Sequence, residues 1–152
     1  MSAAILGLAT ALPSRSIEQT EVADIAATFL FEDPRQGRAL KALFRRSQVR
    51  RRSSVVLEPR DAAGLPQSFY PPAADDQDRG PRTSKRMERY ALEVGPLALA
   101  AAERALAASP CTADQITHLV TVSCTGFAAP GVDVTLIKRL GSAPTVGRVH
   151  VG

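Results

Sequence analysis

The sequence of 152 residues contains no tryptophan, and aromatic side chains make up only 5% of it. Proteins that bind single-stranded nucleic acid stack bases on aromatic rings, so this scarcity argues against that class. Two cysteines, Cys111 and Cys124, are too few for a disulfide framework, and neither lies in a metal-ligand spacing. No apolar run approaches the ~20 residues of a membrane helix, and no basic leader precedes the first apolar segment. We therefore expect a cytoplasmic protein that binds no nucleic acid, metal or membrane.

Several catalytic motifs are also missing. The sequence has no glycine-rich phosphate loop, no paired-carboxylate motif and no serine nucleophile elbow. A nucleophilic cysteine needs a base, and the histidines are His118 and His150. His118 begins the predicted strand that precedes Cys124, roughly 20 Å away in an extended chain, and His150 alternates with valines in another. We therefore assign no catalytic residue and interpret Cys124 as a small buried thiol; a Cys124–His150 dyad is the weaker alternative.

The sequence does contain enough apolar material for one domain, with 45% hydrophobic and 22% charged residues. The net charge of +4 is unevenly distributed, because residues 35–52 carry +8 and the rest of the chain carries −4. The eight basic residues of this stripe are Arg35, Arg38, Lys41, Arg45, Arg46, Arg50, Arg51 and Arg52. Such a stripe suits a localised anion; a solvated arginine-rich surface is the alternative.

The alternation of apolar patterns predicts a layered α/β fold. We expect strands over 3–12, 50–57, 118–123 and 146–152, and helices over 35–47, 83–108 and 132–140. A further helix, capped by Ser16 or Thr20, carries Val22, Ile25, Ala26 and Phe29 on one face. Residues 112–115 form a capping-box pattern. Residues 58–82 hold five of the eleven prolines and are predicted to form an irregular surface loop within one domain, 1–152. Because the last strand has no element after it, we expect a truncated chain.

The segment from Val122 to Gly141, VSCTGFAAPGVDVTLIKRLG, resembles the type III polyketide synthases, the chalcone and stilbene synthase family. Residues 5–13 (ILGLATALP), 40–52 and 116–122 (ITHLVTV) extend the resemblance over nearly the whole chain. It implies a thiolase-like fold, of which this chain is an incomplete N-terminal part of the αβαβα architecture. It also implies an acyltransferase of bacterial type that condenses a starter, linked to coenzyme A, with malonyl-CoA units.

The resemblance further implies which roles the chain supplies. The family's Cys-His-Asn centre lies beyond the last predicted strand, so we expect the chain alone to be inactive. Arg46 matches a basic residue that contacts the phosphates of coenzyme A, and Arg45 and Lys41 are added as its helical neighbours. Coenzyme A thioesters are expected as substrates, with no separate cofactor.

The pocket and the subunit interface are assigned by the same resemblance. Cys124 and Thr125, with the adjoining Gly126, match positions that line the substrate pocket. Ala129, next to Pro130, stands where plant members carry a methionine that crosses the dimer interface. We therefore expect a homodimer at full length, without the starter specificity of plants. Two alternatives stay open: a non-catalytic interaction module of the same half-fold, whose arginine stripe holds an acidic partner, and a ketoacyl synthase of fatty-acid initiation.

Overall fold

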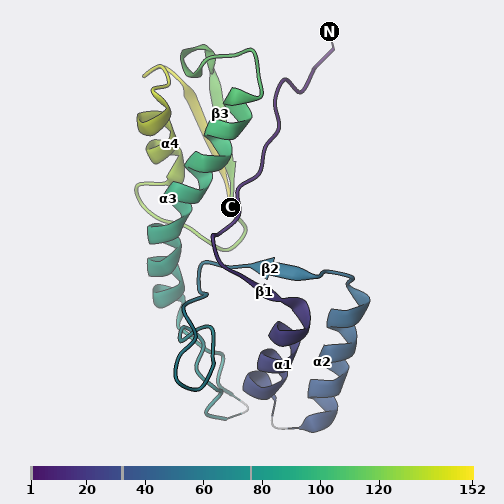
Figure 1. Ribbon diagram of the computed structural model, residues 1–152. Coiled ribbons are helices and arrows are strands. Elements are labelled where there is room, and N and C mark those ends of the chain that lie inside the picture. Colours follow the sequence, from purple (N-terminus) through teal and green to yellow (C-terminus); the bar gives the residue numbers. More distant parts are fainter. Residues whose placement is uncertain (1, 32, 76) are drawn as a thin grey trace. The chain divides into compact units, whose positions relative to one another are not determined.

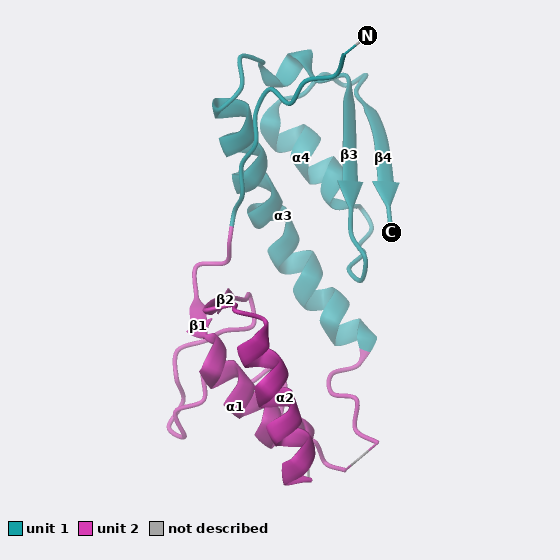
Figure 2. Cartoon of the chain, turned by 90° about the vertical axis from the view of Figure 1, so that its right-hand side faces the viewer, with its two compact units in different colours: residues 1–11, 83–152 teal, residues 12–82 magenta. Residues whose placement is uncertain are grey.

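A computed structural model of the chain describes residues 2–31, 33–75 and 77–152. The chain divides into two compact units, shown in teal and magenta in Figure 2. Unit 1 comprises residues 1–11 and 83–152, and unit 2 comprises residues 12–82. Each unit has its own helices and its own pair of strands.

Unit 2 is built on two helices that pack against each other. They are α1 (Gln19–Leu30) and α2 (Pro34–Arg46), and β1 (Ser16–Glu18) and β2 (Arg51–Ser53) flank them (Figure 1). The helices approach closely at small side chains, because a Cβ atom placed on Gly37 would lie 3.3 Å from the Cβ atom of Ala27. The two short strands are antiparallel. Among the described residues of 54–82 there is no helix or strand.

The two helices of unit 2 begin differently. The Asp33 carboxylate accepts a hydrogen bond of 2.8 Å from the backbone N–H of Arg35, and Pro34 occupies the first turn, so α2 has a regular N-cap. The expected caps of α1 were wrong, because Ser16 pairs with Ser53 in the sheet and Thr20 lies inside the helix. The start of α1 is instead a strand end.

Unit 1 contains a parallel strand pair joined by a helix. The long helix α3 (Thr83–Ala107) leads through η1 (Ala113–Gln115) to β3 (His118–Val122), α4 (Val132–Leu140) and β4 (Gly147–Val151). β3 and β4 are parallel neighbours, and parallel strands require such a crossover connection. α4 ends at Gly141, whose φ of +71° is the left-handed conformation that glycine adopts without strain. These elements confirm the expected helices over 83–108 and 132–140 and the two expected C-terminal strands.

Two expected strands differ in the structure. Residues 3–12 form no strand, and Ile5 and Leu8 are 84% and 80% exposed. The segment is held in part by Arg104, whose guanidinium donates a hydrogen bond of 2.9 Å to the carbonyl of Thr10. The strand expected over 50–57 is shortened to three residues. A strand is defined by its ladder, and neither segment has a neighbour along its full length among the described residues.

The buried core is small in both units. Its hydrophobic members are Ile17 and Ala23 in unit 2, and Leu136 and Val146 in unit 1. One face of the β3–β4 pair is open, since Val120, Val122, Val149 and Val151 are 49–69% exposed. The chain is therefore a partial α/β layer. No helix within the described residues is both long enough and apolar enough to cross a membrane.

Candidate functional site

The turn after β3 carries the residues expected to line the substrate pocket. The Ser123 hydroxyl donates a hydrogen bond of 2.6 Å to the Gly126 carbonyl and accepts one of 3.2 Å from the Gly126 backbone N–H. The backbone N–H of Ser123 also donates to the Val151 carbonyl at 2.9 Å, which ties the turn to β4. One side chain thus closes the turn and fixes its position at the carboxyl end of the strands, where α/β folds bind ligands.

Two side chains of α3 contact this turn. The ring of Tyr90 lies against Gly126 so closely that any Cβ atom at position 126 would overlap it. The Met87 sulfur accepts a hydrogen bond of 3.4 Å from the backbone N–H of Phe127. Met87 and Tyr90 lie three residues apart and so share one face of α3, but nothing in the sequence connects them with the turn.

The environment of Cys124 corrects an expectation. Gly126 is buried, whereas Cys124 and Thr125 are exposed, and the Cys124 thiol is free. The turn presents its backbone to Tyr90 and its two central side chains to the open side, so the thiol is available to a ligand and is not a buried packing group.

His150 has a different role from the one weighed for a catalytic dyad. It lies opposite Thr121 in the β3–β4 pair, and its Nδ1 is 2.8 Å from the Thr121 hydroxyl, with which it shares a hydrogen bond. The described chain gives no hydrogen bond between His150 and Cys124. It also contains no group of three or more residues arranged to hold a metal ion.

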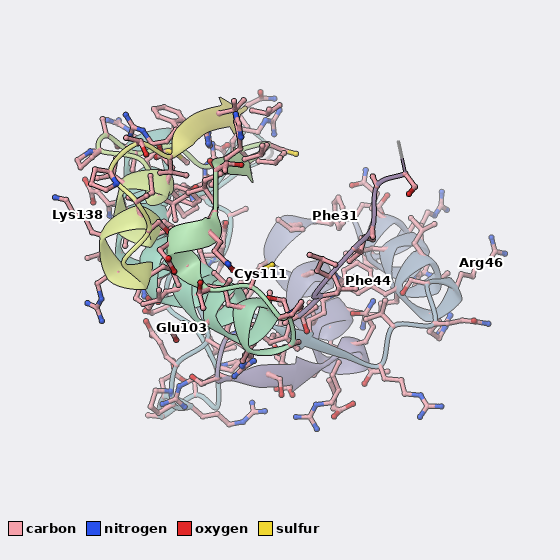
Figure 3. All side chains as sticks on the ribbon, turned by 90° about the horizontal axis from the view of Figure 1, so that it is seen from above. Phe31, Phe44, Arg46, Glu103, Cys111 and Lys138 are labelled. Carbon is pink, nitrogen blue, oxygen red and sulfur yellow. The ribbon has the colours of Figure 1, made fainter. Side chains whose placement is uncertain are left out.

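The cations expected to bind coenzyme A lie on α2 in unit 2. Lys41 and Arg45, one helical turn apart, both line a cavity of about 430 Å³ together with Arg50. The Lys41 ammonium forms an ion pair of 2.7 Å with Asp24 of α1. Arg46 does not line this cavity and extends into solvent (Figure 3). The structure therefore brings Lys41 and Arg45 together and places Arg46 on an adjacent face.

Two arginines of the following strand have polar partners. Arg51 pairs with Glu18 at 3.0 Å, and Arg52 donates a hydrogen bond of 2.6 Å to the amide oxygen of Gln19. Within the described residues, Arg45 and Arg46 form no ion pair. Arg35, Arg38 and Arg50 also form no ion pair in the described part of the chain, so positive charge without a partner extends along α2. At the C-terminal end of the helix, Arg45 and Arg46 also complement the helix dipole.

The sequence of the chain matches the family model of the chalcone and stilbene synthases, N-terminal domain, over residues 1–151. The alpha-pyrone synthesis polyketide synthase-like protein Pks18 of Mycobacterium tuberculosis is 38% identical over 150 residues, which are 98% of this chain and 35% of that protein. The 3,5-dihydroxyphenylacetyl-CoA synthase of Amycolatopsis balhimycina is 30% identical over 145 residues, 95% of this chain and 34% of that protein. The chain spans about a third of the length of these curated relatives.

Solved structures agree with the sequence matches. PKS-I of the brown alga Ectocarpus siliculosus superimposes with a TM-score of 0.75 at 31% identity, over 97% of this chain and 38% of that one. CsyB complexed with CoA-SH gives a TM-score of 0.74 at 27% identity, over 99% and 36% of the two chains. These matches confirm the thiolase-like α/β fold class and lend no support to the interaction-module alternative. The chain belongs to the chalcone and stilbene synthase family, the type III polyketide synthases, and represents the family's N-terminal domain.

Proposed function

We propose that the chain is the N-terminal part of a type III polyketide synthase that condenses an acyl-CoA starter with malonyl-CoA units. In this proposal the chain supplies part of the surface that binds coenzyme A and one wall of the pocket, and other parts of the enzyme supply the catalytic centre. The observation that carries the proposal is a pair of cations at the end of α2, Arg45 and Arg46, for which the described residues offer no ion-pair partner. The structural match to CsyB, whose structure contains CoA-SH, supports it.

The chemistry of the two regions fits this division. Guanidinium groups bind phosphate oxygens through charge-assisted and often bidentate hydrogen bonds. Arg46, Arg45 and Lys41 would hold the phosphates, and Lys41 would exchange its Asp24 partner for a phosphate oxygen. At the turn after β3, Cys124 and Thr125 would face the growing acyl chain. The coenzyme A thioesters are the substrates in this scheme, and no separate cofactor is proposed.

The phosphate-binding role is tested by Arg46→Ala in the synthase that contains this chain. Charge-assisted contacts contribute about 1.5–3 kcal/mol, so KM for malonyl-CoA should rise roughly ten- to a hundredfold with little change in kcat. Arg35→Ala is the matched control, because it removes the same charge at the opposite end of the same helix. An unchanged KM with lowered thermal stability would contradict the role.

The pocket role is tested by Cys124→Ser. The exposed thiol is proposed to touch the acyl chain without accepting it, so this variant should shift the product distribution while covalent acyl loading persists. Mass spectrometry of the intact protein after incubation with starter measures the loading. Loss of all covalent acylation would show that Cys124 is the acceptor and would overturn the assignment.

The assembly is proposed to be a homodimer in which Ala129 and Pro130 contribute to the interface. Both residues are exposed beside the pocket turn, which leaves them open to a second subunit. Ala129→Arg should weaken the dimer in sedimentation velocity, and an unchanged dimer would contradict the placement. We also propose the cytoplasm as the compartment, because two free cysteines suit a reducing environment.

A further inference from the structure

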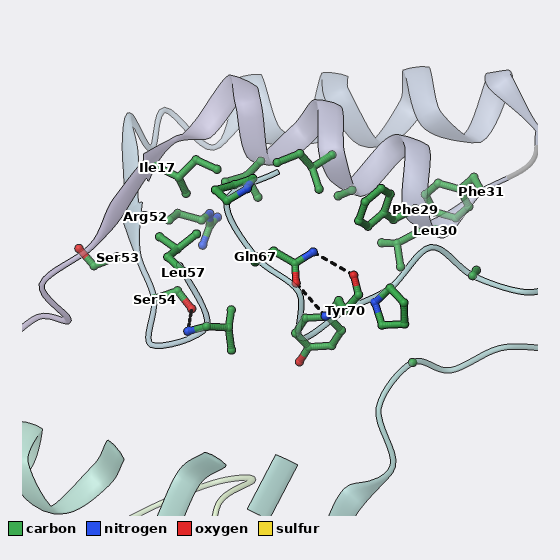
Figure 4. Close-up of a pocket in the computed structure, with 18 of the residues that line it drawn as sticks. Ile17, Phe29, Leu30, Phe31, Arg52, Ser53, Ser54, Leu57, Gln67 and Tyr70 are labelled. Carbon is green, nitrogen blue, oxygen red and sulfur yellow. Dashed lines mark hydrogen bonds between the residues drawn. The ribbon is translucent and has the colours of Figure 1, made fainter. Parts of the chain in front are cut away.

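Unit 2 contains a second, larger cavity that the proposed function does not use. Its volume is about 960 Å³, and most of its lining is apolar. One wall is the face of α1 that carries Val22, Ile25 and Phe29, and the opposite wall contains Leu57 and Tyr70 (Figure 4). This volume lies in the range of cavities that enclose small molecules.

The walls of this cavity are held in place by hydrogen bonds of the loop that follows β2. The side-chain amide of Gln67 donates to the Tyr70 carbonyl at 2.9 Å and accepts from the Tyr70 backbone N–H at 2.7 Å, which fixes the tyrosine against the cavity. The backbone N–H of Ala73 donates to the Phe29 carbonyl at 3.1 Å, which joins the loop to the end of α1. These hydrogen bonds hold the loop against α1 and define the walls of the cavity.

The charged groups that line the cavity differ in how they are satisfied. Arg51 pairs with Glu18, and Arg79 has an interaction partner of its own. The Asp78 carboxylate accepts hydrogen bonds from the backbone N–H groups of Ala74 and Gly80, at 3.0 and 2.7 Å, so it is occupied within the loop.

Arg52 is the exception. Its Nε donates to the neutral amide of Gln19, and its guanidinium carbon lies 5.6 Å from the centre of the Phe44 ring. No carboxylate among the described residues forms an ion pair with it. Within the described residues, the two terminal NH2 groups of this cation have no carboxylate partner, and the side chain lines an apolar cavity. The residue opposite it across the short sheet is the buried Ile17, which also lines the cavity.

From this geometry we propose that the cavity binds an amphiphilic carboxylate, a molecule with one anionic head and an unbranched apolar tail. The carboxylate accepts hydrogen bonds from the terminal nitrogens of Arg52, which match it in shape and charge. The tail lies along Val22, Ile25 and Phe29 and leaves water, which supplies most of the affinity. This inference does not depend on the proposed role of the chain in polyketide synthesis.

The test measures binding of dodecanoate, below its micelle concentration, to the protein carrying all 152 residues. Isothermal titration calorimetry gives the Kd, and amide NMR shifts of Val22 and Phe29 locate the ligand. We expect saturable binding of dodecanoate and at least about tenfold weaker binding of 1-dodecanol, which lacks the charge that Arg52 recognises. Equal binding of the two would overturn the head-group assignment, and no binding of dodecanoate would overturn the site.

Variants separate the site from adsorption to exposed apolar surface. Arg52→Gln should raise the Kd at least about tenfold, and Arg52→Lys should restore part of the affinity because it keeps the charge. Arg50→Gln is the matched control. It removes the same charge two residues earlier in the sequence, and the Arg50 side chain does not line this cavity. The Kd of this variant should be unchanged. Ala26→Phe fills the cavity from α1 and should abolish binding even if Arg52→Gln proves unstable. Wild-type affinity in both Arg52→Gln and Ala26→Phe would overturn the proposal.

Discussion

The two units carry the same net charge of +2, but the charges are dispersed along unit 1 and clustered in unit 2. Unit 1 has 7 basic and 5 acidic residues spread over its elements, whereas unit 2 has 12 basic and 10 acidic residues, with eight of the basic ones in 35–52. Unit 1 presents an exposed row of valines beside a turn of small side chains, and unit 2 presents arginines beside apolar cavities. Equal net charges thus conceal a concentrated positive stripe that is present in unit 2 and absent from the sequence of unit 1.

The units also differ in what holds their functional segments. The pocket turn of unit 1 is fixed by contacts between residues far apart in sequence, such as Tyr90 with Gly126. The segments of unit 2 combine local hydrogen bonds, such as those of Asp33 and Asp78, with long-range ones, such as that from Ala73 to the Phe29 carbonyl. A substitution at the tightly packed long-range contact of Tyr90 with Gly126 should therefore cost more than one at the local cap of Asp33.

The largest effect is expected for Gly126→Ala in unit 1. The new methyl group would overlap the Tyr90 ring, and such overpacking costs about 1–3 kcal/mol in the free energy of unfolding. Chemical denaturation measures the loss. The Gly126→Ala/Tyr90→Ala double variant should be less destabilised than the sum of the single variants, because the overlap is then removed. Gly95→Ala is the control, since its methyl group would only reach 3.4 Å from Thr135 Cγ2. Additive single effects would break the comparison.

A smaller effect is expected for Asp33→Ala in unit 2. The variant removes the side chain that caps α2 and should lower the free energy of unfolding by about 1 kcal/mol. The rate of amide hydrogen exchange in the first turn of α2 should increase by the factor that corresponds to this loss of free energy. Asp33→Asn, which keeps an acceptor oxygen, should retain most of the protection; equal loss in both variants would argue against capping.

A still smaller effect is expected for Thr121→Val, which removes the hydrogen bond between β3 and β4. The hydroxyl is 2.8 Å from His150 Nδ1, but His150 is exposed and can bond to water instead. We expect a loss of about 0.5–1 kcal/mol in the free energy of unfolding. Thermal denaturation of Thr121→Val and of His150→Gln shows whether the two residues act as one pair, because both variants should then lose the same stability. A larger loss for Thr121→Val than for His150→Gln would mean that the hydroxyl has a further role.

The smallest effect concerns the protonation of Asp78. Hydrogen bonds from the backbone N–H groups of Ala74 and Gly80 lower the pKa of this carboxyl below its ordinary value of 3.8. A lowered pKa in the folded state gives a contribution to stability that is present above the unfolded pKa and is lost as the pH falls through the folded one. The Gly80 amide shift should therefore titrate with a midpoint below 3.8. Asp78→Asn should remove that titration; a midpoint at or above 3.8 would contradict the hydrogen bonds.

Local sequence patterns were sufficient for the elements whose stability is local. The helix expected over 83–108 has apolar residues at helical spacing and was confirmed as α3, and the capping box over 112–115 was confirmed by the 2.9 Å hydrogen bond from the Thr112 backbone N–H to Gln115. The family motifs likewise predicted a turn at Cys124, which follows β3, and a basic helix, which is α2. These signals are read within one turn of a helix or one strand, so they do not depend on the rest of the fold.

Features that need a distant partner were decided by the tertiary structure alone. The apolar segment 3–12 is not a strand because no described neighbour completes its ladder. Cys124 is exposed because Tyr90 takes the inner side of the turn, and Arg52 reaches an apolar cavity because β2 pairs it with Ile17. The sequence determined which residues can form helices and where positive charge is concentrated along the chain. Only the packing of segments far apart in the chain decided which side chains are buried, paired or left free, because burial and pairing depend on contacts that no local pattern records.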